Sequence, residues 1–155
     1  MNDTLKKWLL YTLGGLLPVW LLDSVLLPIC VVALSVLEGA FPGAQFGLVA
    51  GAVWALTYAG GSPGRIPLLT LAGMLSGVVS QYALRRSLSG CMLCAAGTVL
   101  LLELLNVLGG LINDLAPAGA LLLTGMGEFA VTLLCTPAVY FLFYHLYRKA
   151  GGKPI

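Results

Sequence analysis

Charged side chains are scarce in this sequence. Eight of its 155 residues are Lys or Arg and six are Asp or Glu, which together make 9% of the chain. A water-soluble domain typically has about a quarter of its residues charged, because charge covers its surface. With 59% apolar residues as well, the composition excludes an ordinary soluble domain and predicts a protein embedded in a lipid bilayer.

The sequence also has few of the residue patterns that carry chemistry. It has one histidine, His145, no H-E-x-x-H pair, no D-D-x-x-D-like acidic cluster and no phosphate-binding glycine loop. Cys91 and Cys94 form a C-x-x-C, but a structural zinc site takes four ligands and the sequence offers no second pair. We therefore expect no enzymatic activity, no metal site and no cofactor.

Long apolar runs alternate with short polar connections along the whole chain. A helix of about 20 residues crosses the hydrocarbon core of a bilayer, and helices satisfy their own backbone amides in lipid. The sequence therefore predicts an all-α integral membrane protein with a single transmembrane domain over residues 1–155. The six predicted spans are about 5–22, 24–38, 42–59, 66–84, 88–112 and 118–147.

The basic residues predict how these spans are oriented. With six spans, seven of the eight Lys and Arg residues lie on one side and only Arg65 lies on the other. Merging the first two spans gives five against three. Because the cytoplasmic side carries the excess of Lys and Arg, we expect six spans with both termini in the cytoplasm, and a first span that stays in place as a signal anchor.

Four of these basic residues form a predicted cytoplasmic basic face: Arg85, Arg86, Arg148 and Lys149. Such a face either sets only the topology or also contacts anionic lipid headgroups or acidic cytoplasmic partners.

Small residues recur every four positions in the third predicted span, and the fourth span has a shorter series. These residues are Gly43, Gly47, Gly51, Ala55 and Ala59, then Gly73 and Gly77. A stripe without side chains lets another helix approach closely. Two interpretations are open: the two spans pack against each other, or they form a docking groove for a partner's single transmembrane helix.

Two acidic residues lie well inside predicted spans. Glu103 and Glu128 each lie about ten residues from the same outer connection, so they share a depth, and Asn106 is one turn from Glu103. Ionisable groups at such depth usually face the bundle interior or a wet cavity. On the sixth span the polar residues recur every four positions, at Thr124, Glu128, Thr132 and Thr136. A hydrogen-bonded seam, a ligand or ion site, and contact with a partner helix are the three open interpretations.

Several segments resemble the rod-shape-determining membrane protein MreD family. They include Leu17-Pro18, residues 26–39 from Leu26-Leu27-Pro28 to Glu38-Gly39, and the G-x-x-x-G of residues 45–51. The ending is also similar, with Glu128, residues 137–140 and the basic pair Arg148-Lys149. Members commonly carry an Asp four residues after the second glycine, where this chain has Ala55, so it is similar to a divergent member.

This resemblance implies a non-enzymatic scaffold subunit of the bacterial cell-elongation machinery, which directs peptidoglycan synthesis and maintains rod shape. The implied location is the bacterial cytoplasmic membrane, and the implied direct partner is an MreC-like bitopic protein. RodA, a class B penicillin-binding protein and MreB would be indirect partners, with membrane lipid around them and no nucleic acid.

The competing interpretation is a substrate-binding subunit of an energy-coupling-factor vitamin transporter. Those subunits are six-helix bundles whose architecture MreD-like proteins resemble. Their vitamin lies in a polar cavity in the outer half of the membrane, which is the depth predicted for Glu103, Asn106 and Glu128.

Overall fold

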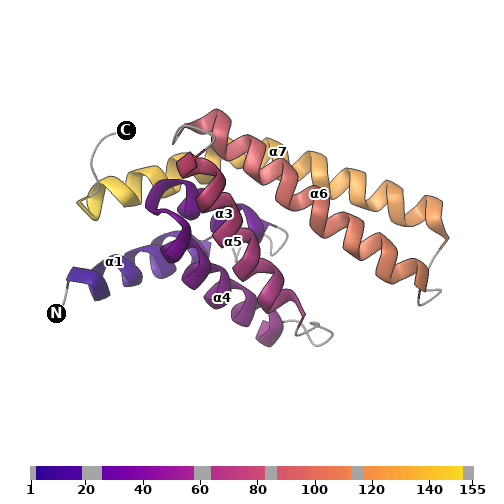
Figure 1. Cartoon of the computed structure of the whole chain (residues 1–155), viewed down its shortest axis with the longest axis horizontal. Helices are drawn as coiled ribbons and strands as arrows, with labels where there is room; N and C mark the ends of the chain where they lie inside the picture. The colour runs from indigo at the N-terminus through magenta and orange to yellow at the C-terminus, as the bar shows by residue number, and fades with distance from the viewer. Residues whose placement is uncertain (1–2, 19–25, 58–63, 83–86, 113–116, 152–155) are drawn as a thin grey trace.

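The computed structural model describes residues 3–18, 26–57, 64–82, 87–112 and 117–151, and the regular structure in these ranges is helical throughout (Figure 1). The all-α class predicted from the sequence is therefore confirmed for them. The helices are α1 (Asp3–Tyr11), the π-helical turn η1 (Thr12–Leu16), α3 (Leu27–Glu38), α4 (Ala40–Thr57), α5 (Arg65–Tyr82), α6 (Leu88–Ile112) and α7 (Ala118–Lys149).

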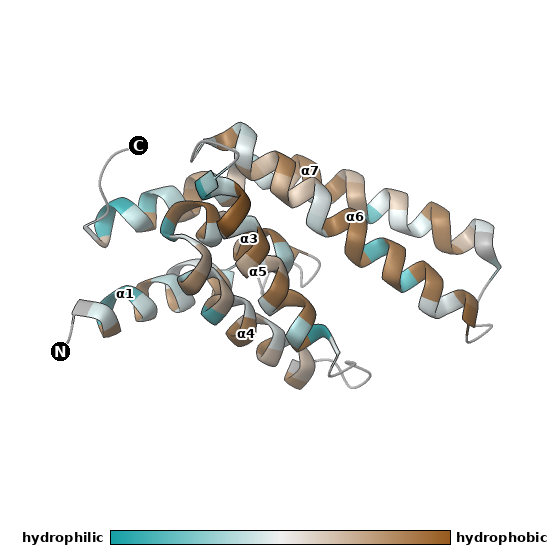
Figure 2. Cartoon of the chain, viewed as in Figure 1, coloured by the Kyte–Doolittle hydropathy of each residue, from teal (hydrophilic) through white to brown (hydrophobic). Residues whose placement is uncertain are grey.

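Two of these helices are long and apolar enough to cross a membrane, over Leu88–Ile112 and Gly119–Lys149. Figure 2 shows hydrophobic residues along most of both helices, with hydrophilic residues at the C-terminal end of α7. Helix α6 has the bounds predicted for the fifth span, and α7 begins where the sixth was predicted and ends two residues later. Helices α3 and α4 are apolar but shorter.

Helix α3 forms the centre of the molecule. All residues from 27 to 37 are buried, and the helix packs against α4, α5, α6 and α7. Pro28 lies in its first turn, where the missing N–H would have no partner in the helix. Its 12 residues measure about 18 Å, against about 37 Å for the 25 residues of α6. The segment predicted as the second span is thus a short core helix in its described part.

Gly39 makes the corner between α3 and α4. Its φ of +110° lies where a residue with a β carbon is strained, and the Gln81 side chain of α5 fills the space beside its Cα. The Gly39 N–H donates to the Ser35 carbonyl oxygen at 2.9 Å, and the Gly39 carbonyl accepts from the Gly43 N–H at 3.0 Å. One residue therefore ends α3 and starts α4.

Helices α4 and α5 form one antiparallel hairpin, and α6 and α7 form another. Both hairpins pack on α3 at the end of the molecule that holds the two chain termini, and they diverge toward the opposite end, called the far end below (Figure 1). The side chain of Arg65, the first residue of α5, reaches Asn106 of α6. Helix α6 continues for six residues beyond Asn106, which is about 9 Å along its own axis.

Helix α1 is attached to the bundle by aromatic and polar contacts. The Trp8 ring lies 6.3 Å from Phe46 of α4, which meets Phe143 of α7 edge-on at 5.8 Å. The Tyr11 hydroxyl donates to Glu38 Oε1 at 2.5 Å. These contacts place the N-terminal helix beside the last turns of α3 and α7.

Candidate functional site

The five glycines of the small-residue series lie at the contact between α4 and α5 and at the Gly39 corner. A β carbon on Gly43 would lie 2.8 Å from the Gly73 carbonyl oxygen, and one on Gly51 would lie 2.8 Å from Ile66 Cα. Gly47 faces the backbone of Leu69 and Thr70 in the same way, and Gly77 faces Gly39 and Ala40. The neighbouring backbone fills the space beside all five, which favours packing within the chain over a groove for a partner's helix.

Three of the predicted polar residues come together at the divergence of the two hairpins, and Arg65 joins them. Arg65 Nη2 donates to Asn106 Oδ1 at 3.2 Å. The Glu103 carboxyl lies close to Glu128 of α7, to Asn106 and to Arg65. These four residues, from α5, α6 and α7, are called the polar cluster below.

The surroundings of the polar cluster fix the side chains of Arg65 and Glu103. The Arg65 guanidinium carbon lies 4.5 Å from the centroid of the Trp54 ring of α4, a cation–π distance. Gly125 of α7 makes room for Glu103, because a β carbon there would lie 3.0 Å from Glu103 Oε2. Arg65 thus connects the α4–α5 hairpin to the α6–α7 hairpin.

The contact of Arg65 with Asn106 is not predicted from the sequence, in which Arg65 is only the one basic group on the outer side. Its part in the cluster depends on the alignment of α5 with α6, which also brings Cys94 Sγ to 4.0 Å from the Ser76 carbonyl oxygen. The available signal was the opposite charge of Arg65 and Glu103 near one end of adjacent spans. That signal does not say how far α6 extends beyond α5.

The polar cluster lies on the inner face of α6, beyond the part of that face that α3 covers. Cys91, Ala95 and Val99 are buried on that face, where α3 packs against α6. Further along the same face, Glu103 is half-buried and Asn106 is exposed. The short length of α3 explains the change, since residues at spacings of three and four share a face but the core helix reaches only part of α6.

The side-chain hydroxyls of the predicted threonines donate hydrogen bonds within their own helix, α7. The hydroxyl of the fully buried Thr132 donates to the Glu128 carbonyl oxygen, and that of Thr136, also fully buried, donates to the Thr132 carbonyl oxygen at 2.9 Å. Thr124 is exposed and donates to the Ala120 carbonyl oxygen at 3.0 Å. Back-bonding of this kind satisfies a hydroxyl on an apolar helix, so Thr124 and Thr132 do not bring their side chains into the polar cluster.

Of the predicted basic face, the structure places Arg148 and Lys149, which are exposed in the last turn of α7. Cations there interact favourably with the helix dipole. Arg85 and Arg86 lie outside the described residues. Within the described part of the chain, no three His, Cys, Asp or Glu residues are arranged to hold a metal ion, and the side chains of Cys91 and Cys94 are free thiols.

Comparison with known proteins gives no match: no family model fits the sequence, and no curated protein or solved structure is significantly similar. The structure itself defines the class, which is an all-helical protein with two helices able to cross a membrane and a mixed-charge polar cluster between two hairpins. Function must be inferred from these features.

Proposed function

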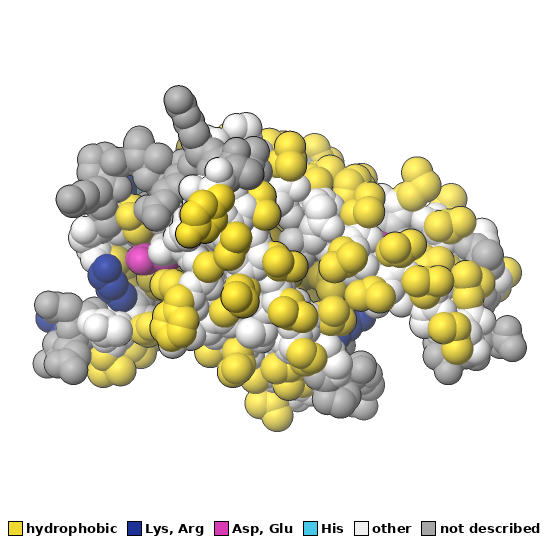
Figure 3. Space-filling view, in the orientation of Figure 1, with side chains coloured by type: hydrophobic (Ala, Val, Ile, Leu, Met, Phe, Trp, Pro, Cys, Tyr) yellow, Lys and Arg dark blue, Asp and Glu magenta, His cyan; other side chains and the backbone are white. Residues whose placement is uncertain are grey.

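We propose that this chain is an integral membrane protein of the bacterial cytoplasmic membrane, with six spans and both termini in the cytoplasm. The surface supports this proposal, because hydrophobic side chains cover much of the face seen in Figure 3. Leu56, Leu123 and Leu134 are 77–88% exposed, and apolar exposure on this scale is unfavourable in water but normal in lipid. The exposed Arg148 and Lys149 lie at the end that holds both termini.

Within this class, we propose a non-enzymatic MreD-like scaffold subunit of the cell-elongation machinery, which binds an MreC-like bitopic partner. RodA, a class B penicillin-binding protein and MreB would be reached through that partner. The observation that carries the proposal is where the MreD-like residues lie. Pro28 starts the core helix, Gly39 ends it, and Gly47 and Gly51 set the α4–α5 contact. The resemblance thus falls on the residues that determine the fold, which supports a shared architecture.

Affinity purification of the tagged chain from its native membranes in mild detergent, followed by mass spectrometry, tests the proposal. We expect an MreC-like bitopic protein and cell-wall synthases to be enriched over a control purification with the same tag on an unrelated six-span protein. Enrichment of neither would contradict the scaffold function.

The polar cluster favours a second candidate, a substrate-binding subunit of an energy-coupling-factor transporter. Under the proposed orientation the far end is the outer side, so Arg65, Glu103, Asn106 and Glu128 would lie in the outer half beside the aromatic Trp54. Such a set of charged and aromatic groups suits a small polar ligand. In that case the same purification would recover ATPase subunits and their membrane coupler.

A further inference from the structure

We propose that the polar cluster binds the headgroup of a zwitterionic phospholipid with a primary ammonium, of the phosphoethanolamine type. Arg65 would hold the phosphate, and Glu103 and Glu128 would accept from the ammonium. This site depends on the proposed membrane location, but not on the scaffold function or on any protein partner.

The charges of the polar cluster match both halves of such a headgroup. A guanidinium has five N–H donors in a planar fork that suits phosphate oxygens, and the bond to Asn106 accounts for one of those of Arg65. Glu103 and Glu128 present two neighbouring carboxyls. The Glu103 carboxyl hydrogen-bonds to Glu128, so the pair shares a proton. An ammonium that donates to both carboxylates would take the place of that proton, which would leave to solvent. The cluster therefore has an anion-binding part and a cation-binding part side by side.

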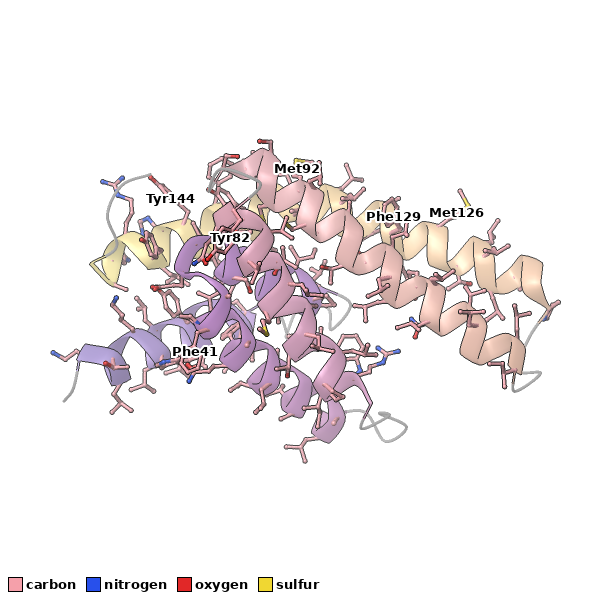
Figure 4. All side chains as sticks on the ribbon, viewed as in Figure 1. Phe41, Tyr82, Met92, Met126, Phe129 and Tyr144 are labelled. Atoms are coloured by element: carbon pink, nitrogen blue, oxygen red, sulfur yellow. The ribbon has the colours of Figure 1, made fainter. Side chains whose placement is uncertain are left out.

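The position of the polar cluster suits a lipid. Arg65 is the first residue of α5, its side chain lies over the Trp54 ring, and Arg and Trp at helix ends are typical of the membrane interface. Leu100 of α6, one turn from Glu103, and Val131 of α7, one turn from Glu128, are exposed, so acyl chains would lie against apolar surface. Among the labelled side chains of Figure 4, Met126 extends from α7 away from α6, which is consistent with a lipid-facing surface around the hairpin.

The exposure of the polar cluster gives a reason for an occupant. Asn106 is exposed, and Arg65, Glu103 and Glu128 are only half-buried. Charged and amide groups that face hydrocarbon are costly, because lipid tails cannot hydrogen-bond to them. A headgroup drawn to this level supplies both donors and acceptors, and the lipid's own chains complete the apolar surface.

Native mass spectrometry of the purified, delipidated chain tests the site. The probes are phosphatidylethanolamine and phosphatidylcholine with identical acyl chains, since choline keeps the charge but has no N–H to donate. We expect the wild-type chain to prefer phosphatidylethanolamine about tenfold or more, because hydrogen bonds to charged groups are the strong ones. The double variant Glu103→Gln, Glu128→Gln should lose this preference, and Arg65→Gln should weaken the binding of both lipids.

Arg148→Gln is the matched control, because Arg148 is an exposed cation at the opposite end, and it should bind lipid as the wild type does. Circular dichroism and gel filtration check that each variant is folded; Arg65→Gln keeps the test available if the double variant is not. Equal binding of the two lipids by the wild-type chain would overturn the proposal. So would an unchanged preference in the double variant, or displacement of the lipid by an equal concentration of water-soluble glycerophosphoethanolamine.

Discussion

Glu38, the last residue of the core helix α3, accepts a hydrogen bond from the hydroxyl of Tyr11. The Tyr11 side chain is buried, Glu38 is half-buried, and the 2.5 Å hydrogen bond between them joins residues 27 positions apart. A carboxylate in such a place needs its donor, since an unsatisfied buried group carries a full desolvation penalty.

Tyr11→Phe should therefore destabilise the protein by about 1–3 kcal/mol, because it removes a hydrogen-bond donor from the half-buried Glu38 carboxyl. The measurement is the Tm of the purified variant in detergent. Tyr82→Phe is the control, since Tyr82 is 86% exposed and loses only a hydroxyl on the surface. Equal Tm values for Tyr11→Phe and wild type would show that the bond contributes nothing.

Thr132 is expected to behave in the opposite way. Its hydroxyl is fully buried but bonds to the Glu128 carbonyl oxygen of its own helix, an acceptor that is not left without a partner when the hydroxyl is removed. Thr132→Val keeps the shape of the side chain, so the change in stability should stay below about 1 kcal/mol. A larger loss in the same thermal measurement would mean that the hydroxyl has a second role.

At the scale of elements, the close contact between α4 and α5 depends on glycines, which have no side chain to separate the two helices. Gly47 faces the Leu69 and Thr70 backbone so closely that no β carbon fits. Gly47→Leu should therefore separate the two helices and abolish accumulation of folded protein. The measurement is the monodisperse yield from membranes.

Gly97 of α6 provides the matched control for that change. Among the described residues, none outside its own helix lies within 4 Å of the position its β carbon would take, and Gly97 is exposed. Gly97→Leu should accumulate normally. If Gly47→Leu also folds normally and loses only a protein partner, the stripe is a docking surface after all.

The α3–α4 corner combines two constraints that a double variant separates. Gly39→Ala introduces a β carbon at φ +110° and also clashes with the Gln81 side chain. Gln81→Ala removes only the clash. We expect the single variant to lose stability and the double variant to keep a loss of about 1–3 kcal/mol, because the backbone strain remains. Full recovery of the Tm in the double variant would show that the clash alone mattered.

The predicted and observed helix bounds agree best for the long apolar segment that forms α6. The long, mainly apolar run of residues 88–112 predicts α6, and the all-α class follows from the same pattern. The second span was harder to predict, because an apolar helix facing lipid and one facing protein have the same composition. Only the contacts of α3 on every side identify it as a core helix.

The candidate site could be predicted in part. Equal distance from one connection places Glu103 and Glu128 at the same level, and the structure brings them together with Asn106. The place of Arg65 in the polar cluster could not be predicted, because its contact with Asn106 depends on the relative lengths and alignment of α5 and α6. The glycine stripe likewise predicts a close helix contact without saying which helix makes it.

At the scale of the whole molecule, the proposed orientation in the membrane predicts which end of the chain a membrane-impermeant reagent can label. Gly119 lies at the far end and Gly151 follows the last helix at the opposite end; both are exposed with open space around them. A membrane-impermeant maleimide should label Gly119→Cys in intact spheroplasts and Gly151→Cys only after lysis. The wild-type chain, with free Cys30, Cys91 and Cys94 buried and Cys135 half-buried, measures the background. Labelling of Gly151→Cys in intact spheroplasts would contradict cytoplasmic termini.

The enclosure of α3 has a consequence for how the chain is made. Helix α3 is buried along nearly all of its described length, and four of the helices that surround it, α4 to α7, follow it in the sequence. During synthesis α3 therefore leaves the ribosome long before most of its neighbours exist. Its final placement must wait for the C-terminal hairpin, so a ribosome stalled before α7 should leave the N-terminal part of the chain unassembled and open to membrane proteases.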